Sequence, residues 1–383
     1  MRIALLGTRG IPANYGGFET FAEELSVRLA ARGHEVTVYC RKSQYGEHMD
    51  EYRGVKRVTL PSLHTKSLDT LSHSAISSLH FCLKSADIAY FCNGANSIFT
   101  LLPRLRGARV ILNTDGLEWE RAKWGFAGKS WYKISERISC VLPHVLASDS
   151  RVIQRYYKGK YGLDTAFVAY GADIVERGTR QDLLEPLGIE PDEYFLYVSR
   201  LEPENNPHLL VKAFEQVKTD KKLLIVGSAP FAHDFIHDLK STTDPRILFP
   251  GALYGDIYAA LRANAYVYVN AMEVGGTHPA ILEAMGAGNC CLVSDIAYNE
   301  EAVAAAGVTF KNKDVDDLRE KLQHLADHPD EVREHGRNAV ERVRTTYIWD
   351  DVVTQYERIF EAMLNRATPT EIAAMTAGNG GGG

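Results

Sequence analysis

Residues 265–294 read AYVYVNAMEVGGTHPAILEAMGAGNCCLVS, and this stretch decides the fold class. The apolar run 265–270 and the run Cys290–Ser294 are typical of short buried strands. Between them, 279–287 has the apolar spacing of a helix, with Pro279 in its first turn, where a missing backbone donor is tolerated. A strand, a helix and a second strand in this order predict a parallel sheet with a crossover helix.

The same alternation extends outward in both directions. Strands are expected at 2–7, 34–40, 88–92, 109–113 and 145–148, and again at 195–199, 222–226 and 247–249. We therefore predict an α/β protein with two doubly wound, Rossmann-like domains. The expected division is residues 1–175, 176–347, a helix over 348–366 that returns to the N-terminal domain, and a disordered tail over 367–383.

The composition excludes several classes of protein. The chain has 383 residues, 45% of them hydrophobic and 24% charged, with a formal net charge of −6. This acidic balance argues against nucleic-acid binding, and the six cysteines, without C-x-x-C spacing, are interpreted as reduced thiols. The opening MRIALLG is interpreted as a strand rather than a signal peptide, and no stretch approaches the length of a membrane span. The expected location is the cytoplasm, and peripheral binding to the inner face of the plasma membrane is an open alternative.

Three loops after strands offer groups suited to phosphate. The first, 7–19, brings Arg9, Gly16 and Gly17 before a helix, whose N-terminal amides favour an anion. It does not fit G-x-G-x-x-G, and a glycine turn without a ligand is the alternative. The second, 198–206, holds Arg200 just past a strand, where it can neutralise a diphosphate or pair with Glu202 or Glu204.

The third loop, Glu273–Gly288, follows a strand and opens a helix. Its backbone amides can face an anion, and the residues concerned are Gly275, Gly276, Thr277 and His278. Glu283 lies one turn into the helix, where its carboxylate can accept hydrogen bonds from ribose hydroxyls. An ordinary solvated helix glutamate is the alternative.

Together these loops resemble the family 4 glycosyltransferases, which are retaining enzymes of the GT-B fold, over residues 1 to about 365. The resemblance implies that two domains face one another across a cleft. It also implies that Glu283 binds the nucleoside ribose, Gly276–His278 hold donor sugar and phosphate, and Arg200 neutralises the diphosphate. Gly16 and Gly17 would close on the donor phosphates.

Three residues depart from the family pattern. Gly275 stands where the first glutamate of E-x7-E belongs, with Glu273 two residues early; Asn205 replaces a basic residue, and Asp115 replaces a histidine. The segments TRGIPANYGGFE, DGLEWERAKW, RLEPENN and VGGTHP resemble a subgroup associated with rhamnosyl transfer in bacterial cell-surface polysaccharide assembly. The implied donor is dTDP-L-rhamnose, and a hexosyltransferase using a UDP- or GDP-sugar is the alternative.

The expected chemistry needs no cofactor and no metal. The Asp314-Val315-Asp316 triplet has D-x-D spacing but opens a charged surface helix, so Arg200, helix amides and Arg9 are expected to stabilise the leaving group. Asp115 is the first candidate to orient or deprotonate the acceptor hydroxyl, and Asp149 is the second. A turn or N-cap role is the alternative for each.

The acceptor is inferred from charge. Residues 121–160 hold nine Lys and Arg against Glu136 and Asp149, with aromatic residues interleaved. Residues 119–160 are therefore expected to contact an anionic membrane surface and so reach a lipid-diphosphate-linked saccharide. The alternative is a basic face whose aromatics lie in the core. Two other classes stay open: a nucleotide-sugar 2-epimerase and a non-catalytic assembly partner.

Overall fold

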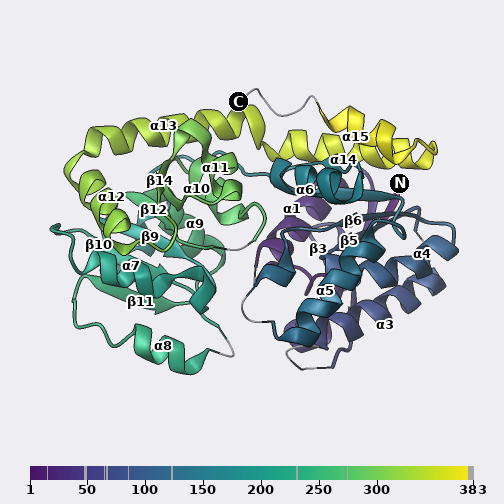
Figure 1. The fold of residues 1–383 in the computed structure, drawn as a ribbon, viewed down its shortest axis with the longest axis horizontal. Helices are drawn as coiled ribbons and strands as arrows, with labels where there is room; N and C mark the ends of the chain where they lie inside the picture. The colour runs from purple at the N-terminus through teal and green to yellow at the C-terminus, as the bar shows by residue number, and fades with distance from the viewer. Residues whose placement is uncertain are drawn as a thin grey trace. The chain divides into compact units, whose positions relative to one another are not determined.

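The computed structural model describes residues 1–14, 16–46, 50–63, 65, 68–84, 86–121, 124–229, 232–273 and 275–377. The chain divides into two compact units (Figure 1). The first unit is Met1–Tyr170 with Trp349–Gly383, and the second is Gly171–Ile348. Each contains one sheet whose strands alternate with helices along the chain, which confirms the α/β class and the two Rossmann-like domains. That the units face one another across a cleft stays a prediction.

The first unit has an eight-stranded sheet that is parallel except for the pairing of β3 with β4. Its spatial order is β3 (Glu51–Tyr52), β4 (Val55–Leu60), β2 (Glu35–Arg41), β1 (Arg2–Leu6), β5 (Ile88–Cys92), β6 (Arg109–Asn113), β7 (Val145–Ser148) and β8 (Ala166–Phe167). Its helices are α1 (Gly17–Ala31), α2 (Lys42–Tyr45), α3 (Asp69–Lys84), α4 (Leu101–Leu105), α5 (Phe126–Ser139), α6 (Arg151–Tyr161), α14 (Trp349–Leu364) and α15 (Pro369–Ala377). The strand order reverses between β1 and β5.

Helix α14 belongs to the first unit although it comes last in sequence. The Phe21 ring of α1 lies 6.2 Å from Trp349 and 5.8 Å from Tyr356. Glu357 accepts hydrogen bonds from Arg32 at 2.6 Å and is 2.8 Å from His34 Nε2. These contacts hold α14 against α1.

The tail expected to be disordered from residue 367 instead forms α15 over Pro369–Ala377. Ile372 is fully buried, and the Phe167 amide donates to Thr376 Oγ at 3.0 Å. The prediction was wrong for these residues because burial against β8 stabilises a helix whose sequence alone carries too few apolar residues to predict it. Residues 378–383 lie outside the described residues.

The second unit has a six-stranded, fully parallel sheet. Its order is β11 (Ile247–Gly251), β10 (Lys222–Val226), β9 (Tyr194–Val198), β12 (Val267–Asn270), β13 (Cys290–Ser294) and β14 (Val308–Phe310). Its helices are α7 (Pro207–Phe214), α8 (His233–Leu239), α9 (Gly255–Asn264), α10 (Pro279–Gly286), α11 (Ala297–Val303), α12 (Val315–Asp327) and α13 (Pro329–Thr346). In order of appearance this is 3-2-1-4-5-6, the doubly wound order, with its switch point between β9 and β12.

Alternate strand residues of the second unit point into one core. Phe195 and Tyr197 of β9 pack there with Leu210 and Phe214 of α7 and Leu322 of α12. Because successive side chains of a strand point to opposite faces, helices cover both sides of this sheet.

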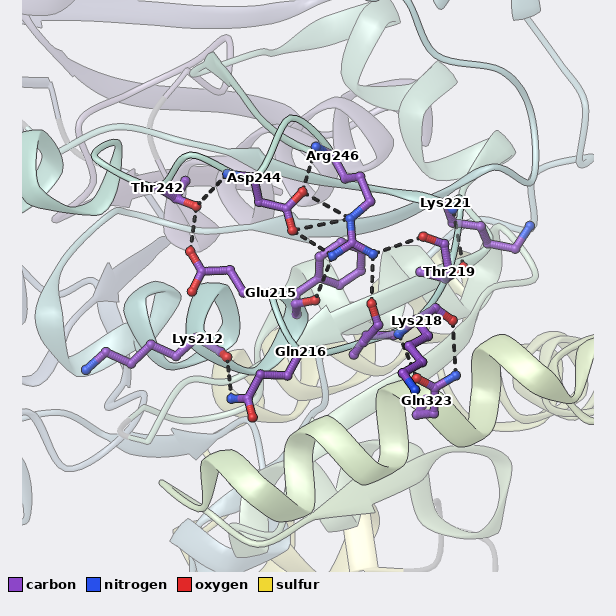
Figure 2. Close-up of polar contacts among 12 residues, drawn as sticks. Lys212, Glu215, Gln216, Lys218, Thr219, Lys221, Thr242, Asp244, Arg246 and Gln323 are labelled. Atoms are coloured by element: carbon purple, nitrogen blue, oxygen red, sulfur yellow. Dashed lines mark hydrogen bonds and ion pairs between the residues drawn. The ribbon is translucent and has the colours of Figure 1, made fainter.

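A polar cluster closes the amino-terminal edge of this sheet (Figure 2). Arg246, directly before β11, donates to both carboxylate oxygens of Asp244 and to the carbonyl oxygens of Val217 and Thr219. Gln323 of α12 bonds the backbone of Lys218 on the same side. These residues join strands to helices at the edge opposite the one where ligands bind such sheets.

Among the described residues, no helix combines the length and the apolar character needed to cross a membrane.

Candidate functional site

The loops after β9 and β12 meet at the switch point of the second unit. The Glu273 amide donates to the Glu204 carbonyl oxygen at 3.3 Å, and Asn206 Nδ2 donates to the Ala271 carbonyl oxygen at 2.9 Å. Ligands of open α/β sheets bind outside the carboxyl ends of the strands where the order reverses. The second and third sequence-predicted loops are therefore brought together at the place where this sheet type binds nucleotides.

Arg200 stands at the end of β9 with its side chain 28% exposed, and its Nη1 lies 3.8 Å from Glu202 Oε1. At this distance the two charges attract without a hydrogen bond between these two atoms. Asn205 Nδ2 donates to the Arg200 carbonyl oxygen at 2.6 Å, and the Asn205 side chain is 2% exposed. Asn205, which stands where the family pattern has a basic donor-site residue and which we included among the donor-binding candidates, is buried and hydrogen-bonds the loop that carries Arg200.

The glycine-rich loop leads from β12 into α10. Gly275 has a φ of +151°, in the region that favours glycine, so a glutamate at this position would strain the backbone. This is a physical reason why the acid expected there is absent. Gly276 and Thr277 are buried and stand directly before α10, whose first-turn amides point back toward them.

His278 is anchored to the next strand. Its Nδ1 lies 3.2 Å from Asn299 Oδ1, and Asn299 Nδ2 donates to Ser294 Oγ at 2.9 Å. Ser294 Oγ in turn donates to the Met272 carbonyl oxygen at 2.7 Å. This chain of bonds links Met272 and His278, which flank the glycines, to Ser294 of β13.

Glu283 on α10 is not a solvated helix glutamate. Its Oε2 accepts from Tyr258 Oη at 2.9 Å and lies 2.7 Å from Arg262 Nη1. Both carboxylate and guanidinium are mostly buried, at 17% and 16% exposed, and the Arg262 guanidinium lies 4.3 Å from the Tyr258 ring centroid. Burial and the Glu283 carboxylate raise the pKa of Tyr258 above its usual value, so its hydroxyl stays a donor.

Sequence reasoning missed Tyr258 and Arg262. They are four residues apart on α9, so they share one helix face, but nothing in the sequence joins that face to α10.

Glu273, whose role was uncertain from sequence, forms an ion pair with Lys313. Asp314 caps α12 by accepting from the amides of Asp316 and Asp317. Asp314 is therefore the N-cap of α12, and the triplet opens a helix as expected.

In the first unit, the loop after β1 is held by α1 and α2. The Arg9 amide donates to Glu19 Oε1 at 2.9 Å, and Arg9 Nη1 donates to Gln44 Oε1 at 3.3 Å. Tyr45 Oη donates to the carbonyl oxygens of Gly10 and Pro12 at 2.9 and 2.8 Å. Gly16 directly precedes α1, and Gly17 is its first residue, which puts both at a helix N-terminus as expected.

Asp115 and Asp149 follow β6 and β7 and differ in burial. Asp115 has a φ of +55°, is partly exposed and donates its amide to Asn113 Oδ1 at 2.9 Å. Asp149 is 1% exposed, which places its carboxylate out of reach of a solvent-borne acceptor. Burial, then the charges of Asp115 and Asp149, raise the pKa of Tyr170 well above its usual value.

The basic and aromatic segment 119–160 is partly neutralised within the first unit. Glu136 accepts from Trp119 Nε1, Tyr156 Oη, Tyr161 Oη and Lys160 Nζ, at 2.8, 2.9, 2.5 and 2.7 Å. Arg121 pairs with Glu118 and Lys158 with Asp164; Lys123 lies outside the described residues. The outer side of α5 still presents Phe126, Ile134, Lys133 and Arg137 to solvent.

Comparison with known proteins finds a family match within the second unit. Residues 192–328 match the family model for glycosyl transferases group 1. This region is a glycosyltransferase group 1 domain. The expectation of a glycosyltransferase is thereby confirmed at the level of this domain, which contains Arg200, the glycine-rich loop and Glu283. Residues 1–173 match a family described as a domain of unknown function, DUF1972.

Two relatives are similar over about half the chain. D-inositol 3-phosphate glycosyltransferase of Gordonia bronchialis is 28% identical over 234 residues, 54% of this chain and 50% of that protein. An uncharacterized glycosyltransferase of Methanocaldococcus jannaschii is 21% identical over 207 residues, 50% of this chain and 53% of that protein. The match thus spans about half the length of these curated relatives.

Solved structures share the fold of the glycosyltransferase domain together with the first unit. Sucrose-phosphate synthase from Thermosynechococcus elongatus has a TM-score of 0.80 at 18% identity, covering 96% of this chain and all of that chain. Anabaena HepE, in complex with UDP and glucose, has a TM-score of 0.76 at 15% identity, covering 94% and 100%. WaaG, a glycosyltransferase involved in lipopolysaccharide biosynthesis, has a TM-score of 0.70 at 15% identity, covering 99% and 100%. The fold is therefore the GT-B fold.

Proposed function

We propose that this chain is a retaining, metal-independent family 4 glycosyltransferase that transfers L-rhamnose from dTDP-L-rhamnose to a lipid-diphosphate-linked saccharide in bacterial polysaccharide synthesis. The observation that carries the proposal is the junction at the β9–β12 switch point. There, Arg200, the amides before α10 and Glu283 all belong to a glycosyltransferase group 1 domain. Arg200 and the α10 amides neutralise the diphosphate, and Glu283 binds the nucleoside sugar.

The bonds of Glu283 support a deoxyribonucleotide. Tyr258 and Arg262 both bind Oε2, so one carboxylate oxygen is already engaged before a nucleotide arrives. A ribose has two adjacent hydroxyls, which are best bound by both oxygens of a carboxylate. The deoxyribose of dTDP has one of them, the 3′-hydroxyl, and Glu283 Oε1 alone can accept its hydrogen bond. An unmatched ribose hydroxyl would lose a hydrogen bond worth about 1 kcal/mol. This favours dTDP over UDP or GDP as the donor nucleotide.

The transfer proceeds by front-face attack. The acceptor oxygen bonds to the anomeric carbon as the bond from that carbon to the β-phosphate oxygen breaks, and the acceptor proton passes to the leaving phosphate. Asp115 orients the acceptor hydroxyl, because it is the more exposed of the two candidate aspartates. Asp149, which is buried, supports the local structure and does not meet the substrate. Arg9, Gly16 and Gly17 contribute to donor-phosphate binding from the first unit.

The outer side of α5 supports binding to an anionic membrane. Phe126 is 90% exposed, Ile134 50% and Val141, just past the helix, 71%. Exposed apolar side chains beside Lys133 and Arg137 suit an interface with anionic lipid, with about 1 kcal/mol for each well-placed cation. Flotation with anionic and neutral liposomes tests this: the proposal requires binding that depends on anionic lipid and falls in Phe126→Ser.

A second candidate, a hexosyltransferase using a UDP-sugar, is favoured by the complex of Anabaena HepE with UDP and glucose. The deciding experiment offers the full chain dTDP-L-rhamnose, dTDP-glucose, UDP-glucose and GDP-mannose, each with a synthetic polyprenyl-diphosphate-linked monosaccharide. Mass spectrometry should find a deoxyhexose added only from dTDP-L-rhamnose. Hexose transfer from UDP-glucose would replace the donor assignment. An epimerised donor would show that the chain is a nucleotide-sugar epimerase instead of a transferase. The absence of turnover with every donor would favour a non-catalytic assembly partner.

A further inference from the structure

We propose that His324, His328 and Glu331 form a binding site for a divalent transition-metal ion of the zinc class. The three residues lie where α12 ends and α13 begins (Figure 1). They belong to the second unit but take no part in the donor site, so the proposal goes beyond the glycosyltransferase function and does not depend on it.

The three side chains converge. One ligand atom from each lies within 4.8 Å of the others. His324 Nε2 is 2.7 Å from Glu331 Oε2, and the two imidazole rings stack with centroids 4.1 Å apart. An ion pair between His324 and Glu331 would explain the first contact alone. It does not explain why a second imidazole stands in the same group.

The tautomer of His328 is set in the way metal-ligand histidines require. His328 Nδ1 lies 2.7 Å from the His324 carbonyl oxygen. A carbonyl oxygen only accepts, so Nδ1 carries the hydrogen and Nε2 keeps its lone pair. Donation of one ring N–H to a backbone carbonyl is the common second contact of a histidine that binds metal through the other nitrogen.

The backbone under the site is firmly placed. His324 lies in the last turn of α12, and His328 is the single residue between α12 and α13. Leu322 and Leu325 of α12 are buried to within 1%, and Val332 of α13 is 5% exposed. The three ligands are exposed side chains on this buried support, and rotation of them would shorten the present separations of up to 4.8 Å between ligand atoms to those that the 2.0–2.2 Å bonds typical of zinc require.

Two imidazoles and one carboxylate are the donor set that suits zinc rather than magnesium or calcium, which prefer all-oxygen sites. Water would complete the coordination, because the site is exposed. A bound ion would link α12 to α13 and stabilise the folded chain by an amount that rises with the logarithm of the free ion concentration over its Kd.

The test uses the full chain without an affinity tag, stripped with chelator and titrated with ZnCl₂ by calorimetry. We expect one tight site per chain and a rise in the midpoint of thermal unfolding of about 3 °C. His328→Ala and Glu331→Gln should each weaken zinc binding by roughly tenfold or more and remove the thermal shift. Circular dichroism checks that the variants fold. We expect that they do, because the substituted side chains are exposed.

His237→Ala is the matched control, because His237 is an exposed histidine on α8 beside Asp238. It should leave stoichiometry and affinity unchanged. Zinc uptake that persists equally in His324→Ala and His328→Ala, or no saturable uptake by the unaltered chain, would overturn the proposal.

Discussion

Arg262 Nη1 lies 2.7 Å from Glu283 Oε2, and this contact joins α9 to the helix that follows the glycine-rich loop. Tyr258 Oη reaches the same oxygen from one turn earlier on α9. Both donors approach a single carboxylate oxygen, so they orient Glu283, and we propose that the nucleotide binds at Oε1. The nucleotide preference of the domain is thus expected to depend on two residues that need not touch the nucleotide.

The double variant Tyr258→Phe with Arg262→Met tests that dependence. Removing both donors frees Oε2, so a ribose diol can then be bound with both oxygens. We expect the preference for dTDP over ribothymidine diphosphate, roughly five- to tenfold for one hydrogen bond, to fall to near one. Calorimetric titration with the two nucleotides measures it. Arg180→Met, which removes an exposed arginine of the same unit, is the control and should keep the preference.

Arg200→Ala should weaken dTDP by roughly ten- to a hundredfold, because a charge-assisted bond to the diphosphate is lost. Thymidine, which has no phosphate, should bind the variant and the unaltered chain equally. Arg200→Lys keeps the charge and should recover part of the affinity. Equal losses for thymidine and dTDP would mean that Arg200 maintains the loop rather than binding the diphosphate.

Asn205→Ala separates positioning from binding. Its amide holds the Arg200 carbonyl oxygen, so its loss should loosen the Arg200 loop while the charge remains. We expect weaker dTDP binding than in the unaltered chain, with a milder loss than in Arg200→Ala. The double variant of Asn205→Ala with Arg200→Ala should bind dTDP no more weakly than Arg200→Ala alone if Asn205 acts only through Arg200. A further loss of affinity in the double variant would contradict this.

Asp115→Asn should lower kcat by about a hundredfold or more with little change in donor affinity, since the carboxylate is proposed to act on the acceptor hydroxyl. Asp164→Asn, a carboxylate of the same unit that pairs with Lys158, serves as control. Single-turnover kinetics with saturating donor make the comparison. Near-normal turnover of Asp115→Asn would remove Asp115 from catalysis.

Glu136→Gln should destabilise the first unit by about 2–4 kcal/mol at pH 7, because a buried carboxylate with four donors loses its charge. Burial raises the pKa of Glu136, but the bonds from Lys160, Tyr161, Tyr156 and Trp119 outweigh it and leave the pKa below its usual value. The stabilisation is therefore present above the unfolded pKa, near 4.5, and is lost as the pH falls through the lower folded value. Urea unfolding of both proteins from pH 7 to pH 3 should show the gap in stability closing in that acidic range.

The regular elements of the two sheets were largely predictable. The strands 88–92, 109–113, 145–148, 222–226 and 290–294 occur where their apolar runs predict them, and Trp349–Leu364 is helical as expected. Buried parallel strands are near-continuous apolar runs, so their local signal is strong. Helix α15 was missed because its stability comes from burial of Ile372 and from the bond between Thr376 and Phe167, both contacts with a distant segment.

The amino-acid sequence by itself determined the α/β class, the alternation of strands and helices, and the loops that carry Arg200, Gly275–His278 and Glu283. These follow from local periodicity and from glycine and proline placement, which act over a few residues. Only the tertiary structure decided which partners the side chains around those loops have and which of them are buried. It buried Asn205 and Asp149, paired Glu273 with Lys313 and placed Arg262 against Glu283. Such partners lie up to 40 residues apart in sequence, and their meeting depends on strand order, which no local pattern encodes.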